Sequence, residues 1–105
     1  MKEITVQELK RMRDNNESFQ LIDVREPHEA EIASIGGELI PMGDIVGQFE
    51  KVSKDKQVVI HCRSGARSAS VIQMLEKQYG FTNLYNLKGG IIAWANEIDS
   101  SVATY

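Results

Sequence analysis

The sequence predicts an α/β fold with a mainly parallel sheet, and three observations lead to this class. The chain has 105 residues, of which 42% are hydrophobic and 26% are charged, which is typical of one globular domain. Short apolar segments that suit strands alternate with segments of helical spacing. Residues 57–62 form a β-branched run without alternating polar positions, which indicates a strand covered on both faces. We therefore expect a single domain over residues 1–105.

The first part of the chain predicts two strands separated by a helix. Ile4 lies in a short strand, and Thr5 caps the helix because Glu8 occupies the matching capping-box position. Residues 19–24 are apolar enough for a buried strand, which ends before Pro27. The apolar face of the helix consists of Val6, Leu9 and Met12.

The middle of the chain predicts shorter elements. Pro27 suits the first turn of a short helix that continues through Ala33. Residues 39–40 form a brief extended segment. Asp44 is then in position to cap a helix that reaches about Val52.

The second half of the chain predicts two further strand–helix units. The strand over residues 57–62 precedes a helix over residues 68–79, which Gly80 terminates. A strand over residues 84–87 follows, and the glycine pair at 89–90 opens the last helix. The apolar face of that helix contains Ile91, Trp94 and Ile98.

Composition and charge exclude several classes of protein. The net charge is -3 and no basic stripe appears, so we expect no nucleic-acid partner. One Cys and two His exclude an internal disulfide and a four-ligand zinc site built from these residue types, and we expect no cofactor. No apolar run is long enough to cross a membrane, and the first residues lack the apolar stretch of a signal peptide. We therefore expect a cytoplasmic protein without a membrane partner.

A polar loop follows the strand over residues 57–62 and leads into a helix. Backbone N–H groups at a helix N-terminus, together with arginines, stabilise an anion and lower the pKa of a Cys thiol. Cys62 is alternatively a small buried hydrophobic residue, as free cysteines often are. The polar residues beside it favour a reactive thiolate, with Cys62 and Arg67 as catalytic candidates. The residues expected to bind substrate are Arg63, Ser64, Gly65, Ala66 and Ser68.

Three segments of the chain resemble motifs of the rhodanese family of sulfurtransferases. Residues 21–26 contain its Asp-Val-Arg motif, residues 62–67 resemble its active-site loop, and residues 87–94 resemble its closing Gly-Gly and Trp. The resemblance implies a five-stranded, mainly parallel sheet with helices on both faces. It also implies that Cys62 accepts a sulfane sulfur.

A narrower resemblance involves rhodanese domains fused behind ubiquitin-like activating enzymes, the molybdopterin-synthase sulfurylase type. Residues 25–29, 35–41 and 93–99 are similar to that subgroup. Residues 33–38 lack the His that many rhodaneses show there, which favours the same subgroup. A sulfur-carrier protein or an activating enzyme is therefore an expected partner.

The closest alternative is a cysteine phosphatase or arsenate reductase, in which five residues separate Cys from Arg. Here four residues separate Cys62 from Arg67, and the narrower loop favours a sulfur atom over a phosphoryl group. A phosphatase also needs a general acid, for which Asp23 is the only obvious candidate. Two other classes stay open: a docking module whose pocket is unused, and a thiol redox sensor.

The residues together predict a sulfurtransferase of the thiosulfate type. Cys62 takes a sulfur from thiosulfate or a persulfide-bearing protein and passes it, as a Cys62 persulfide, to cyanide, a thiol or a sulfur-carrier protein. We expect Asp23 and Arg25 to support the loop as an ion pair at the end of a strand. His61 is expected to point to the opposite face from Cys62, as a packed and hydrogen-bonded side chain.

Overall fold

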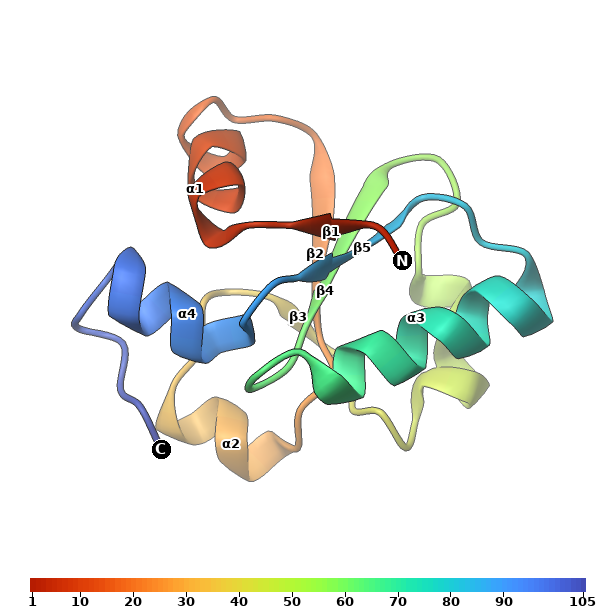
Figure 1. Cartoon of the computed structure of the whole chain (residues 1–105). Helices are drawn as coiled ribbons and strands as arrows, with labels where there is room; N and C mark the ends of the chain where they lie inside the picture. The colour runs from red at the N-terminus through yellow and green to blue at the C-terminus, as the bar shows by residue number, and fades with distance from the viewer.

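Five strands form one sheet in the computed structural model, which describes residues 1–105 (Figure 1). The order across the sheet is β1-β5-β4-β2-β3, and every neighbouring pair is parallel. The predicted α/β class and the parallel sheet of five strands are confirmed. The strands are β1 (Glu3–Ile4), β2 (Phe19–Asp23), β3 (Glu38–Leu39), β4 (Gln57–His61) and β5 (Leu84–Leu87).

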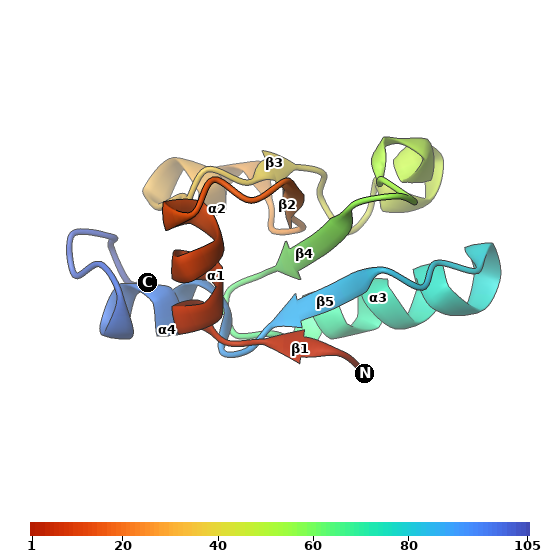
Figure 2. The same cartoon turned by 90° about the horizontal axis from the view of Figure 1, so that it is seen from above.

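Helices cover both faces of the sheet, as Figures 1 and 2 show with α1 and α4 on one side and α3 on the other. The central strand β4 divides its side chains between the two sides because successive residues of a strand point to opposite faces. Val58 and Ile60 pack in the core beneath α3, whereas Val59 packs in the core beneath α1 and α4. The helices are α1 (Val6–Asp14), α2 (Pro27–Ile32), the 3₁₀ helix η1 (Ile45–Lys51), α3 (Ala66–Tyr79) and α4 (Gly90–Glu97).

Two predicted helix boundaries are confirmed in atomic detail. The Thr5 hydroxyl accepts a hydrogen bond from the Glu8 backbone N–H, and the Glu8 carboxylate accepts one from the Thr5 N–H. At the other end of the molecule, Gly80 closes α3 in the left-handed conformation that favours glycine. None of the helices is long and apolar enough to cross a membrane.

Two predicted helices differ from the structure. The segment after Asp44 is the 3₁₀ helix η1, with a kink at Gln48, and the Asp44 side chain makes no capping hydrogen bond. Asp44 has helical backbone angles, whereas a capping residue is extended, so its carboxylate does not reach the next turn. The helix predicted from Ser68 begins earlier, at Ala66, because Gly65 turns the chain at a φ of 111°.

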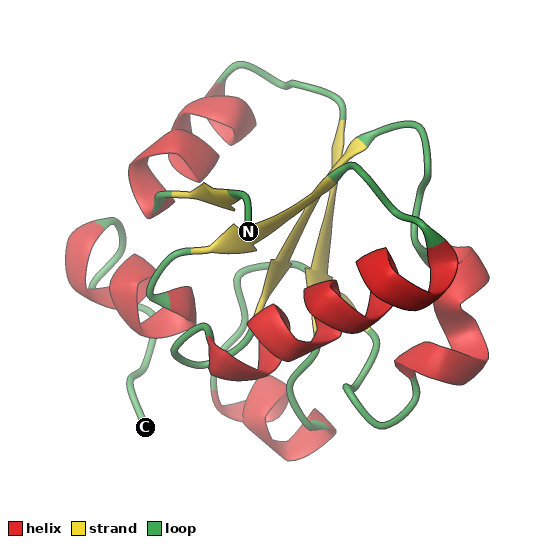
Figure 3. Cartoon of the chain, turned by 45° about the vertical axis from the view of Figure 1, so that its right-hand side comes forward, coloured by secondary structure: helices red, strands yellow, loops and turns green.

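The loops that follow β2, β4 and β5 lie at one edge of the sheet, because the carboxyl ends of the parallel strands meet there (Figure 3). Asp23 at the end of β2 is directly opposite His61 at the end of β4. The turn after β5 meets the loop after β4 so closely that a Cβ on Gly90 would lie 2.4 Å from the carbonyl oxygen of Arg63. Ligands of open parallel sheets bind at this edge, so the fold directs attention to the residues that follow β4.

Candidate active site

The loop after β4 is held in place from the α4 side. The backbone N–H of Ile91 donates to the Cys62 carbonyl at 3.1 Å, and that of Ile92 donates to the Arg63 carbonyl at 3.2 Å. These two hydrogen bonds fix the first residues of the loop against the N-terminus of α4. The Gly-Gly pair identified in the sequence therefore lets the start of α4 pack directly against the Cys62 loop, since only a residue without a Cβ fits at Gly90.

The Cys62 sulfur is surrounded by hydrogen-bond donors of its own loop. Cys62 is 1% exposed, and its Sγ accepts from the Gly65 N–H at 3.1 Å and from the Ser68 N–H at 3.5 Å. The Ser68 hydroxyl oxygen lies 3.4 Å from the same sulfur. Burial opposes ionisation of the thiol, but the hydrogen bonds from Ser68, Gly65 and Ser64 outweigh it and lower the pKa of Cys62. The arrangement favours a thiolate at this position.

Ser68 links Cys62 to a residue that sequence reasoning missed. Its hydroxyl lies 2.6 Å from Asn86 Oδ1, and the Asn86 amide nitrogen donates to the Gly65 carbonyl at 3.1 Å. Asn86 lies on β5 and is buried, so it ties the loop to the neighbouring strand. An Asn in the middle of a short strand carries no motif of its own, and only the tertiary structure shows this contact.

Asp23 and Arg25 form a buried ion pair. Arg25 Nε donates to Asp23 Oδ1 at 2.9 Å and Nη2 donates to Oδ2 at 2.7 Å, while the exposed fractions of the two side chains are 0% and 2%. Nη2 also donates to the Ala33 carbonyl at 2.8 Å, which connects the end of β2 to the end of α2. Both Asp23 oxygens therefore accept hydrogen bonds from Arg25, which holds the carboxylate within the ion pair and away from the Cys62 loop.

Arg67 is paired with Glu29, a second residue missed by sequence reasoning. The two terminal nitrogens of Arg67 donate to the two carboxylate oxygens of Glu29, at 2.6 Å and 2.9 Å. The Arg67 hydrogen bonds are the largest cause of the lowered pKa of Glu29, and the same pair raises the pKa of Arg67. In the sequence, Glu29 is one of several glutamates on an exposed-looking helix, so nothing there distinguished it.

Tyr105 completes this network from the other end of the chain. Its hydroxyl donates to Glu29 Oε2 at 2.8 Å and accepts from Arg25 Nη1 at 2.8 Å. Arg63 donates to the Tyr105 backbone carbonyl, and its guanidinium carbon lies 5.2 Å from the centre of the Tyr105 ring. The structure thus connects the predicted residues Arg25, Arg63 and Arg67 through contacts that no local pattern reveals.

His61 is buried behind the loop. Its Nδ1 lies 3.2 Å from the Cys62 carbonyl oxygen, and its Nε2 has no hydrogen-bond partner and lies 3.8 Å from Asp23 Oδ2. The predicted buried packing of His61 is therefore accompanied by a hydrogen-bond contact at one of its two ring nitrogens. Burial lowers the pKa of His61, because the neighbouring Asp23 compensates only in part. The imidazole is therefore neutral at pH 7 and contacts the backbone of Cys62.

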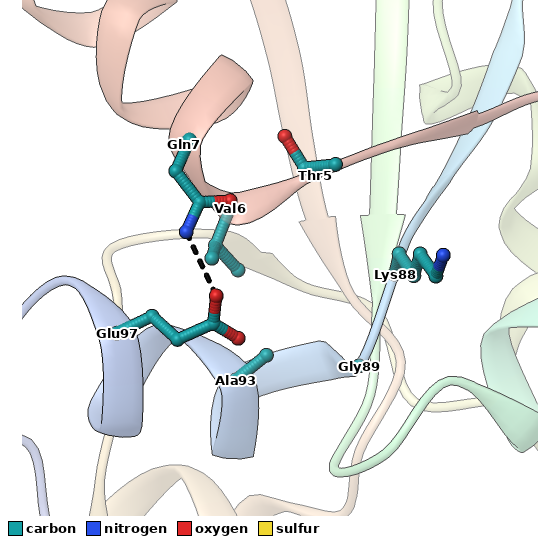
Figure 4. Close-up of a pocket in the computed structure, with 7 residues that line it drawn as sticks. All are labelled: Thr5, Val6, Gln7, Lys88, Gly89, Ala93 and Glu97. Carbon is teal, nitrogen blue, oxygen red and sulfur yellow. Dashed lines mark hydrogen bonds between the residues drawn. The ribbon is translucent and has the colours of Figure 1, made fainter.

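The one cavity in the structure, shown in Figure 4, is not lined by Cys62. It has a volume of about 320 Å³ and lies between the start of α1, the end of β5 and α4. Gln7 Nε2 donates to Glu97 Oε1 at 2.8 Å across it. The predicted site residues do not line it, and no cluster of His, Cys, Asp or Glu suited to a metal ion occurs in the chain. Its lining residues are Thr5, Val6, Gln7, Lys88, Gly89, Ala93 and Glu97.

Comparison with known proteins places the chain in a family. Residues 5–97 match the Rhodanese-like domain. The putative sulfurtransferase YtwF of Bacillus subtilis is 42% identical over 92% of this chain and 93% of its own length. A rhodanese-like domain protein from Staphylococcus aureus has a similar solved structure, with a TM-score of 0.83 and 31% identity over 100% of this chain and 99% of that one.

A longer relative is the probable adenylyltransferase/sulfurtransferase MoeZ of Mycobacterium tuberculosis. It is 36% identical over 97% of this chain, which spans only 26% of its length. The match to the domain, the relatives and the shared fold show that the chain belongs to the rhodanese-like family. Within this family, the relatives with sulfurtransferase names support sulfur transfer as the general activity.

Proposed function

We propose that the chain is one rhodanese domain over residues 1–105 and that Cys62 is the nucleophile of a sulfur-transfer cycle. The observation that carries this proposal is the buried Cys62 sulfur, which accepts hydrogen bonds from the backbone N–H groups of Gly65 and Ser68. These donors stabilise a negative charge on sulfur, and a thiolate is the form of cysteine that attacks another sulfur atom.

The cycle has two half-reactions. In the first, the Cys62 thiolate attacks the outer sulfur of thiosulfate, a new S–S bond forms, and sulfite leaves with the electrons of the broken bond. In the second, cyanide, a thiol or a carrier protein attacks the terminal sulfur of the Cys62 persulfide and releases the Cys62 thiolate. Residues 1–105 contain no second cysteine to resolve the persulfide, so the acceptor comes from outside these residues.

The loop residues hold the donor and the persulfide during this cycle. The backbone N–H groups of Ser64, Gly65 and Ser68 form the anion-binding surface. At its rim, Arg63 supplies positive charge and Arg67 supplies hydrogen-bond donors. Asp23 and Arg25 stabilise the end of β2 and do not act on the substrate, because their charged groups bind each other in a buried ion pair. We assign the site to sulfur rather than phosphate because Cys62 and Arg67 are separated by only four residues and both Asp23 oxygens are engaged by Arg25.

A sulfur-carrier protein is the acceptor class that the relatives favour. The name of MoeZ combines adenylyl transfer with sulfur transfer, and this chain matches only a part of it. We propose that an activating enzyme or a carrier protein presents the acceptor to Cys62.

Intact mass spectrometry tests the proposed cycle. The protein incubated briefly with thiosulfate is expected to gain one sulfur atom, and subsequent cyanide is expected to remove it. The Cys62→Ser variant is expected to gain none. A gain that persists in Cys62→Ser, or hydrolysis of an aryl phosphate without any gain, contradicts the proposal.

A further inference from the structure

Four hydrogen bonds hold the carboxylate of Glu29 at the edge of the Cys62 loop. It accepts two hydrogen bonds from Arg67, one from the Tyr105 hydroxyl and one from the Glu26 backbone N–H at 3.1 Å. The Glu29 side chain is only 10% exposed. These contacts lower the pKa of Glu29, so the side chain keeps its negative charge at neutral pH.

The pairing changes the electrostatics of the candidate active site. Arg67 interacts with the Cys62 thiolate, which contributes to the raised pKa of Arg67, but Glu29 balances the Arg67 charge. Asp23 balances the charge of Arg25 in the same way. Among the arginines around the loop, only the exposed Arg63 has no carboxylate partner. The site therefore offers little net positive charge to a donor that carries two negative charges.

Arg67 still has donors for a substrate. A guanidinium carries five N–H groups, of which Glu29 takes two, so three N–H groups remain on Arg67. The pair with Glu29 fixes the plane of the guanidinium, and the Tyr105 hydroxyl fixes the Glu29 carboxylate in turn. Glu29 therefore positions Arg67 as a hydrogen-bond donor while it cancels the Arg67 charge.

We propose that Glu29 is a specificity-determining residue that disfavours dianionic sulfur donors such as thiosulfate and favours hydropersulfides of low charge. This inference rests on the proposed sulfur-transfer cycle and deepens it by naming the class of donor. With a hydropersulfide RSSH, the Cys62 thiolate attacks the outer sulfur, the Cys62–S bond forms and the RS–S bond breaks. RS⁻ leaves with the bonding electrons, and the proton stays on the transferred sulfur. The single negative charge passes from Cys62 to the leaving thiolate, and no dianion enters the loop.

The test compares the rate of sulfur loading onto Cys62 from two donors. Thiosulfate is the dianionic donor, and the hydropersulfide of N-acetylcysteine amide is the donor without other charged groups. Initial rates of loading are followed by intact mass spectrometry, before any acceptor is added and before the released sulfite or thiol accumulates, so the second half-reaction contributes little to the result. In Glu29→Gln, we expect thiosulfate loading to rise roughly tenfold, because an uncompensated Arg67 attracts the dianion. Loading from the hydropersulfide is expected to change less than about twofold.

Glu31→Gln is the matched control. Glu31 lies on the same helix, is exposed and forms no ion pair, so its replacement removes the same formal charge without freeing Arg67. We expect its ratio of the two loading rates to equal that of the wild type. A purely structural role for Glu29 predicts that Glu29→Gln slows both donors by the same factor, and that result overturns the inference.

The salt dependence of thiosulfate loading provides a second test. We expect loading to fall more steeply with added salt in Glu29→Gln than in the wild type, because the variant adds an uncompensated Arg67 to the exposed Arg63. Equal salt dependence in the two proteins contradicts the inference. Failure of the sulfur-transfer cycle itself gives a different result, which is the absence of loading from either donor in every variant.

Discussion

The buried pair of Asp23 and Arg25 gives a quantitative test of what holds the candidate site together. Replacing Arg25 by Met keeps an unbranched apolar side chain but removes the guanidinium group with its charge and its donors. Asp23 is then left as a buried carboxylate without a cation, and the Ala33 carbonyl and the Tyr105 hydroxyl lose a hydrogen bond. The free energy of unfolding is expected to fall by about 3–5 kcal/mol, the usual cost of removing one partner of a buried ion pair.

An exposed ion pair in the same protein provides the comparison. Lys10 and Asp14 are 2.6 Å apart on α1, but their side chains are 47% and 58% exposed. Lys10→Met is therefore expected to cost only about 0.3–0.5 kcal/mol. Urea denaturation followed by the fluorescence of the single tryptophan measures both variants. A loss below about 1 kcal/mol for Arg25→Met refutes the reasoning that the pair braces the loop edge.

Three further predictions concern the loop and its surroundings. Ser68→Ala removes the hydroxyl group that contacts the Cys62 sulfur and is expected to raise the pKa of Cys62. The pH dependence of Cys62 alkylation measures this pKa. An unchanged pH profile contradicts a stabilising role of the Ser68 hydroxyl for the thiolate. Gly90→Ala is expected to lower the free energy of unfolding by at least about 2 kcal/mol, because the φ angle of Gly90 is +60° and the new Cβ meets the backbone of the Cys62 loop. The control is Gly43→Ala, which has open space around it. Its free energy of unfolding is expected to stay within about 0.5 kcal/mol of the wild-type value. The lowered pKa of Glu29 means that its contribution to stability is present above the ordinary glutamate pKa of about 4.3 and is lost as the pH falls below it. Thermal unfolding in acid is therefore expected to show a smaller loss of stability for Glu29→Gln than for the wild type, and equal losses contradict the assignment.

Local sequence signals predicted most of the fold because the relevant contacts are close in sequence. The Thr5 and Glu8 capping box joins residues three apart, and Gly80 ends α3 through its own backbone conformation. The run from Gln57 to His61 indicated a central strand because both faces of that strand are buried. A helix follows Asp44 as predicted, but it is a 3₁₀ helix with a kink at Gln48, and Asp44 forms no capping hydrogen bond because its own backbone angles are helical.

The sequence predicted only those residues of the candidate site that belong to a local sequence motif. Cys62 and its loop were visible because a strand, a polar turn and a helix occur in succession. Glu29, Asn86 and Tyr105 were not, since each reaches its partner across a long stretch of chain. Glu29 and Tyr105 bond to each other although they are 76 residues apart, and no periodic pattern encodes such a contact.

A single-turnover experiment tests the central claim, a covalent sulfur intermediate on Cys62, most directly. The protein is loaded with thiosulfate, separated from the free donor and then mixed with cyanide. The proposed cycle predicts about one thiocyanate per chain for the wild type and none for Cys62→Ser. Thiocyanate that forms only while donor and cyanide are present together shows direct transfer without the intermediate and contradicts the account.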